Sequence, residues 1–180
     1  MRIALFAWDS LDSIFVGGAG VHVSELARAL AVLGHEVHLF TRRAASQDNY
    51  QHVDSIFLHR CDFEADNDFA REAWNMCRSF AHRYLTMRAS VGEFDIVHAH
   101  DWLTAEVLSM VRHQSSARLI LTMHSTEYGR CGNGSIQAEA RSYGIANGRA
   151  SSSPNGSSVS AGRCGTRSYG TIALPATNAA

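Results

Sequence analysis

The feature that most constrains the fold is the alternation of short apolar runs with amphipathic segments over the first 123 residues. Strand-length apolar runs occur at residues 2–7, 36–41 and 54–59, and again from Phe94 and from Leu119. Between them, apolar residues three or four positions apart predict helices over about 21–33, 66–89 and 102–114. Strands that alternate with helices predict a parallel sheet with right-handed crossovers. The expected fold is therefore α/β, a Rossmann-like doubly wound sheet.

The apolar positions of the two longer helices predict which of their faces are buried. In the first helix these are Leu26, Leu30 and Leu33, and Gly34 follows where a left-handed C-cap belongs. The second carries a stripe typical of core packing, made of Phe69, Ala73, Met76, Phe80, Tyr84 and Met87.

The composition changes at about residue 150. Residues 151–180 contain both prolines of the chain and no acidic residue, and Ser, Gly and Ala dominate. Too little apolar surface is present to offset the entropy lost on ordering. We expect one folded domain over 1–147 and a disordered tail over 148–180, as would arise from a frameshift near codons 148–152.

Several partners and locations are disfavoured by composition. The net charge is -1, so no nucleic-acid partner is expected. No apolar run is long enough to cross a membrane or to form a signal peptide. The four cysteines have no C-x-x-C spacing and fit free thiols in a reducing cytoplasm, which is the expected location.

Glycines or polar residues follow three of the predicted strands. Gly17, Gly18 and Gly20 follow the first strand and precede a helix, Asp101 follows the fourth strand, and His124 follows the fifth. Loops that leave the carboxyl ends of parallel strands line a common crevice, so this edge is the expected site. The glycines could instead form a tight turn that needs positive φ, and Asp101 could serve only as a helix N-cap.

Four stretches of the chain carry a resemblance to a known family. They are Val16-Gly-Gly-Ala-Gly-Val-His-Val23, Leu33-Gly-His-Glu-Val-His-Leu-Phe-Thr41, His98-Ala-His-Asp-Trp102 and Thr122-Met-His-Ser-Thr-Glu-Tyr-Gly129. In this order they resemble the N-terminal half of retaining nucleotide-sugar glycosyltransferases of the glycogen/starch synthase-like group, over about residues 1–147. The resemblance implies one of the two domains of a GT-B fold, with the C-terminal nucleotide-binding domain absent.

The resemblance also implies how the donor sugar is held. Gly17, Gly18 and Gly20 would approach the donor diphosphate and sugar through backbone amides, and His22 is either a cleft residue or a polar residue near the helix start. His124 would lie beside the transferring sugar, where its imidazole or backbone carbonyl stabilises positive charge at the anomeric carbon. The alternative for His124 is a half-buried histidine with a structural hydrogen bond.

On the acceptor side, the resemblance implies that Asp101 accepts a hydrogen bond from a sugar hydroxyl. Trp102 would present an apolar face to a sugar ring, unless it anchors the domain. Glu127 and Arg130 would touch acceptor hydroxyls.

The expected function is transfer of a hexose such as glucose from an ADP-glucose or UDP-glucose type donor to a glycan hydroxyl, without a metal or other cofactor. The chain alone is expected to be inactive and prone to self-association, since the partner domain is missing. Two alternatives remain open: a non-catalytic truncated or interaction domain, and a metal-dependent hydrolase that uses His98, His100, Asp101 and His124. A dinucleotide site competes for the glycine loop, although Arg42 and Arg43 stand where an acid would be expected.

Overall fold

The computed structural model describes residues 1–124 and the strand Gly170–Leu174. The elements in chain order are β1 (Arg2–Phe6), α1 (Gly18–Val32), β2 (Glu36–Arg42), β3 (Tyr50–Val53), β4 (Ile56–Cys61), α2 (Phe69–Val91), β5 (Ile96–His100), the 3-10 turn η1 (Trp102–Thr104), α3 (Ala105–Val111), β6 (Arg118–Met123) and β7 (Gly170–Leu174). Within the described residues, none of the helices combines the length and apolar content that crossing a membrane requires.

The strands form one sheet in the order β3-β4-β2-β1-β5-β6-β7. The inner strands are parallel to one another, and β3 and β7 pair antiparallel at the two edges. From the central β1 the chain moves outward to β2 and β4, then returns to the other side of β1 to form β5. Loops after β1 and β5 therefore leave in opposite directions and open a crevice. The predicted doubly wound α/β fold is confirmed, with two antiparallel edge strands added.

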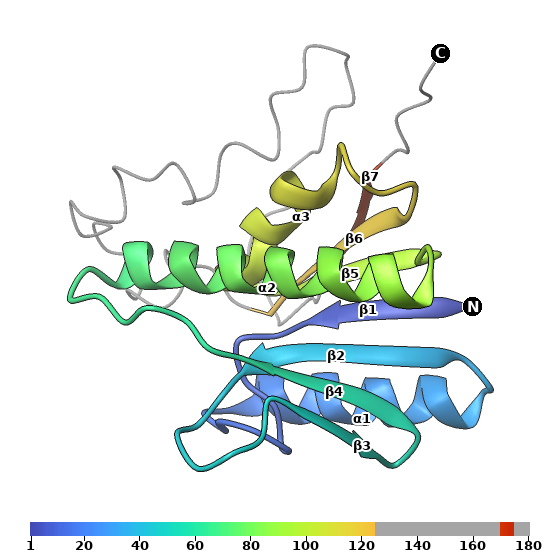
Figure 1. Cartoon of the computed structure of the whole chain (residues 1–180), viewed down its shortest axis with the longest axis horizontal. Helices are drawn as coiled ribbons and strands as arrows, with labels where there is room; N and C mark the ends of the chain where they lie inside the picture. Colours follow the sequence, from blue (N-terminus) through green and yellow to red (C-terminus); the bar gives the residue numbers. More distant parts are fainter. Residues whose placement is uncertain (125–169, 175–180) are drawn as a thin grey trace.

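The central strand β1 divides the core into two clusters, one on each face of the sheet. Ile3 and Leu5 pack with α1, while Ala4 and Phe6 pack with α2 and α3. Helix α1 accordingly covers one face of the sheet, and α2 and α3 cover the other (Figure 1). Phe6 stacks on Phe40 of β2 with ring centroids 4.9 Å apart. The alternation of side chains along one strand thus supplies both cores.

Helix α1 differs from the expectation at its start and on its buried face. It begins at Gly18 rather than near Val21, and it buries Val23 and Ala27, whereas Leu33 is 71% exposed. Of the predicted leucines, Leu30 is partly buried and packs against the same core cluster as Val23 and Ala27. Gly34 does adopt the predicted left-handed conformation, with φ of 82°.

The other two helices agree with the predictions in part. Helix α2 buries Ala73, Met76, Phe80 and Tyr84 of the expected stripe, but its first residue, Phe69, is 43% exposed. The helix expected over 102–114 is shorter, with the 3-10 turn η1 followed by the seven-residue α3.

An antiparallel hairpin replaces the single strand expected at residues 54–59. Asp54 and Ser55 both have positive φ, 49° and 62°, and they form the two-residue turn between β3 and β4. Turns of this kind match the twist of the flanking strands. The missed strand β3 lacks an apolar pattern because it is largely exposed at the sheet edge.

Strand β7 contradicts the expectation of a tail that is disordered throughout 148–180. The backbone of Gly170–Leu174 pairs antiparallel with β6, so that Thr171 lies opposite Thr122 and Leu174 opposite Leu119. Without it, β6 would present unpaired backbone groups at the sheet edge, and a Thr-Ile-Ala-Leu run suits a strand. The other residues of the expected tail, and the expected boundary near 147, lie outside the described residues.

Candidate functional site

The loop between β1 and α1 is organised by Asp9, a residue that the sequence reasoning did not single out. Its Oδ2 accepts hydrogen bonds from the backbone N–H groups of Val16 and Gly17, at 3.2 and 3.0 Å. A Cβ atom added at Gly20 would lie only 2.6 Å from the same oxygen. Gly20 therefore lacks a side chain because α1 approaches this carboxylate closely. The one available signal was an acid three residues beyond the end of the first buried strand.

The other two glycines leave backbone open to a ligand. A Cβ atom at Gly17 or Gly18 would meet nothing within 4 Å, and neither residue has positive φ. The tight-turn interpretation of this loop is thus wrong. The N-cap Gly17 makes no side-chain capping bond, and the first turn of α1 contains no acidic residue. The Asp9 carboxylate already faces this end of the helix dipole through the Gly17 N–H, and the open space beside Gly17 and Gly18 leaves room for a polar sugar group.

Arg42 and Arg43, which could have held a 2′-phosphate, are both engaged in structural contacts. The Arg42 guanidinium lies 4.0 Å over the Trp8 ring, and its Nε donates to the Trp8 carbonyl at 2.6 Å. Arg43 pairs with Asp62 at 2.6 Å. The glycine loop also fails to follow β1 directly. These observations disfavour the dinucleotide alternative.

Asp101 combines an N-cap with a strained backbone. Its carboxylate accepts from the Trp102 N–H at 2.9 Å, as the cap interpretation required. Its φ of 68° and ψ of 167° lie in a region that residues other than glycine rarely adopt. The Asp101 N–H donates to the carbonyl of Thr122 at 2.7 Å, which ties the end of β5 to β6. Such strain at a strand end is typical of a functional position.

Aromatic side chains form a wall beside Asp101. Trp102 is 9% exposed and meets Phe69 edge to face, with centroids 6.1 Å apart. Phe69 in turn meets Trp8 at 5.5 Å. The burial of Trp102 favours the anchoring role, although within the described part of the chain its indole N–H has no hydrogen-bond partner.

The crevice between the glycine loop and this wall is a cavity of about 320 Å³. Two carboxylates, three aromatic rings and open glycine backbone line it, with members that include Trp8, Asp9, Gly17, Gly18, Phe69, His100, Asp101 and Trp102. Its walls come from the ends of β1 and β5 and from the starts of α1 and α2, so the predicted edge of the sheet holds a pocket.

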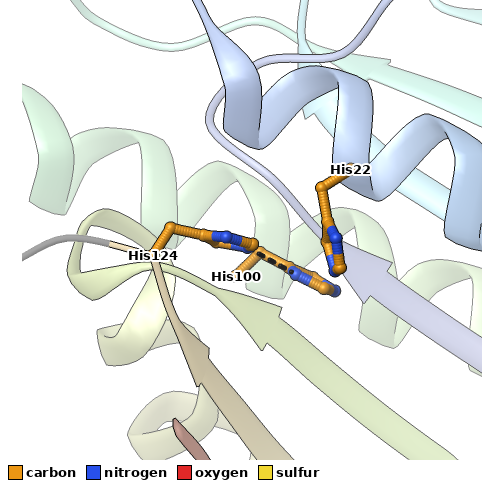
Figure 2. A group of neighbouring side chains, drawn as sticks. All are labelled: His22, His100 and His124. Carbon is orange, nitrogen blue, oxygen red and sulfur yellow. Dashed lines mark hydrogen bonds between the residues drawn. The ribbon is translucent and has the colours of Figure 1, made fainter. Parts of the chain in front are cut away.

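Three histidines from distant parts of the sequence meet at this edge (Figure 2). His22 extends from α1, His100 ends β5, and His124 follows β6. His100 Nδ1 and His124 Nε2 lie 3.2 Å apart, so one ring donates to the other. The rings of His22 and His124 have centroids 4.8 Å apart. The structure thus brings both predicted histidines of the site, His22 and His124, together with His100, which lines the crevice.

The four residues of the hydrolase alternative do not form the ligand cluster. Among the described residues, the ligand atoms that lie together, within 4.8 Å, belong to His22, His100 and His124. His98 packs at 4.0 Å from the His100 ring, but its Nε2 is hydrogen-bonded to Thr122 Oγ1 at 2.8 Å. That bond occupies the Nε2 atom of His98, and His98 is not one of the three clustered ligands.

Burial lowers the pKa of His98, His100 and His124 below the ordinary histidine value. Desolvation lowers the pKa of His100 to about 2 and that of His98 to about 4. For His124, burial and the neighbouring His22 lower the pKa, against the opposing effect of Asp101 and Asp9. Neutral imidazoles can both donate and accept hydrogen bonds. The predicted acceptor residues Glu127 and Arg130 lie outside the described residues.

Comparison with known proteins places this geometry in a family. An uncharacterized glycosyltransferase of Methanocaldococcus jannaschii is 30% identical over 132 residues, which are 73% of this chain and 33% of the relative. Glycogen synthase of Mycobacterium tuberculosis is 29% identical over 147 residues, covering 72% of this chain and 35% of that protein. The chain thus spans about a third of the length of these relatives.

Solved structures show the same fold. Sucrose-phosphate synthase from Thermosynechococcus elongatus superposes with a TM-score of 0.61 at 22% identity, over 76% of this chain and 36% of that one. The catalytic domain of starch synthase IV from Arabidopsis thaliana superposes with a TM-score of 0.53 at 17% identity, over 78% and 38%. Both neighbours are GT-B glycosyltransferases. The family model of Glycosyltransferase Family 4 matches residues 16–152, and the chain belongs to that family.

Proposed function

We propose that this chain supplies the N-terminal half of the catalytic cleft of a retaining glycosyltransferase that moves a hexose from a nucleotide-diphosphate sugar to a glycan hydroxyl. The observation that carries the proposal is the convergence at one sheet edge of a glycine-rich helix N-terminus, three histidines and a carboxylate-lined pocket. Family membership supports the reaction class.

The donor contacts are assigned to the glycine loop and the histidines. Gly17 and Gly18 leave room for a phosphate or sugar oxygen at the start of α1, and Asp9 holds the loop in that position. His22 and His124 would hydrogen-bond the hydroxyls of the transferring sugar. As the diphosphate departs, positive charge develops at the anomeric carbon, and fixed acceptors beside it lower the barrier.

The acceptor is assigned to the pocket beneath Asp101. A cavity of about 320 Å³ is at the lower end of the range of ligand pockets, so it suits a terminal sugar unit rather than a long glycan segment. The Asp101 carboxylate would accept from a hydroxyl, and the exposed part of Phe69 beside Trp102 would contact an apolar sugar face. We propose that the transfer itself uses no metal or other cofactor.

Transfer would need a second domain. The relatives are about three times longer than the matched segment. In a cleft enzyme both halves must surround the reacting carbon, because the rate depends on excluding water and orienting both substrates. The donor would be of the ADP-glucose or UDP-glucose type.

Amide NMR titration of the purified chain tests the assignment. UDP-glucose and ADP-glucose are expected to shift the amides of Gly17, Gly18 and Gly20, and a glucan oligosaccharide those around Asp101. His124→Ala should weaken the response to nucleotide sugar. The matched control is His113→Ala, which removes an exposed histidine beyond α3 and should leave the response unchanged. Shifts confined to the β3–β4 edge, or none at millimolar ligand, would refute the proposal.

A further inference from the structure

We propose that His22, His100 and His124 form a binding site for one divalent transition-metal ion of the zinc class. The three rings project from α1, from the end of β5 and from the segment after β6 toward a common point (Figure 2). One ligand nitrogen from each lies within 4.8 Å of the other two. Imidazole nitrogen is a preferred ligand of zinc, and three such ligands leave one position open.

Two of the three rings already have the required separation. Zinc–nitrogen bonds of about 2.0–2.1 Å at tetrahedral angles place two nitrogen ligands about 3.4 Å apart. His100 Nδ1 and His124 Nε2 are separated by 3.2 Å. In the metal-free protein these atoms share one hydrogen. When an ion binds, that hydrogen moves to the remote nitrogen of its own ring, and both facing lone pairs bind the metal.

The third ring is the one that can adjust. His22 lies on the exposed surface of the first turns of α1, whereas His100 is 2% exposed and cannot move. The His22 ring is 4.8 Å from the His124 ring and 5.7 Å from the His100 ring, measured between centroids. An exposed side chain changes rotamer at little cost, so His22 closes the remaining gap.

The surroundings favour a cation. The carboxylates of Asp9 and Asp101 both act electrostatically on His124. Among the described residues that line the adjoining cavity there is no arginine to compete with an ion. The His100 Nε2 has no hydrogen-bond partner in the described part of the chain. Missing outer hydrogen bonds weaken metal sites about 10–100-fold, so the affinity should be lower than that of a structural zinc site.

Metal binding has a consequence that rests on the proposed function. The ion would occupy the place assigned to the transferring sugar, and metal and nucleotide sugar would exclude each other. The metal would then act as an inhibitor of this site and not as its cofactor. Metal binding itself is independent of that assignment and is tested without any sugar.

Cobalt titration of the tag-free chain 1–180 gives a direct readout. One Co²⁺ per chain is expected, with the visible d–d absorption of a four-coordinate ion, and Zn²⁺ should displace it. Cys61 and Cys77 should contribute no thiolate-to-cobalt bands, because both are buried in the core. His22→Ala should lower the Co²⁺ affinity at least ten-fold, whereas His113→Ala should match the parent chain.

Because His22 is exposed, we expect His22→Ala to fold like the parent chain, so that a lower Co²⁺ affinity reports loss of a ligand. The melting temperature of His22→Ala checks that it is folded. Nitrogen-detected NMR provides a test without mutation, since coordination should shift His100 Nδ1 and His124 Nε2. Equal affinity in His22→Ala and the parent, or no d–d absorption at millimolar Co²⁺, overturns the metal site. Co²⁺ binding that UDP-glucose does not displace leaves the metal site standing and counts against the sugar position in the proposed function.

Discussion

Replacing Gly20 by alanine tests whether Asp9 holds the glycine loop in place. The added Cβ would lie 2.6 Å from Asp9 Oδ2 and 3.1 Å from its Cγ. Relief of that contact must move the carboxylate, which then releases the N–H groups of Val16 and Gly17. Overpacking costs about 1–3 kcal/mol, and loss of a charge-assisted hydrogen bond about 1.5–3 kcal/mol. The gain in helix propensity returns only about 1 kcal/mol.

The expected net loss in the free energy of unfolding is about 2–4 kcal/mol, which corresponds to about 4–16 °C in melting temperature for a domain of this size. Gly18→Ala is the matched control. It lies in the same first turn of α1, where an added Cβ meets nothing within 4 Å, so it should be neutral or stabilising by up to about 1 kcal/mol. Urea unfolding followed by circular dichroism measures both variants. Equal midpoints for the two would refute the close approach between α1 and Asp9.

Three further outcomes are expected. The purified chain should transfer no glucose from UDP-glucose or ADP-glucose to a glucan in a product assay; turnover that His124→Ala abolishes would contradict the need for a second domain. The chain should self-associate in sedimentation experiments, because Phe15 and Val16 are 54% and 67% exposed beside the glycine loop; Phe15→Ser should shift it toward the monomer, and a monomer at high concentration would contradict this. Stability should fall as the pH drops below about 6.5, because burial lowers the pKa of His59 to about 3 in the folded state while the unfolded chain binds the proton near 6.5. His59 alone should cost about 2 kcal/mol between pH 7 and pH 5, and a His59→Phe variant with an unchanged pH slope in urea unfolding would show that the slope has another origin.

Much of the fold could be predicted because periodicity is a local property. The apolar runs of β1, β2, β5 and β6 and the apolar stripe of α2 can each be recognised from a short stretch of sequence. In the folded chain each of these elements forms as its pattern predicted. Strand β3 could not be predicted in this way, since an exposed edge strand needs no apolar face. Strand β7 was missed because its partner among the described strands, β6, lies about fifty residues earlier in the chain.

For the site, the sequence by itself determined which strand ends carry polar residues, and with the resemblance it predicted roles for His124, Asp101 and the glycine loop. Only the tertiary structure showed that Asp9 binds that loop, that Gly20 is required for close approach rather than for positive φ, and that His22 and His100 join His124. The reason is physical: chemical type and local spacing are written along the chain, whereas contacts between strand ends depend on the order of strands in the sheet. That order brings residues 9, 22, 100 and 124 to one edge.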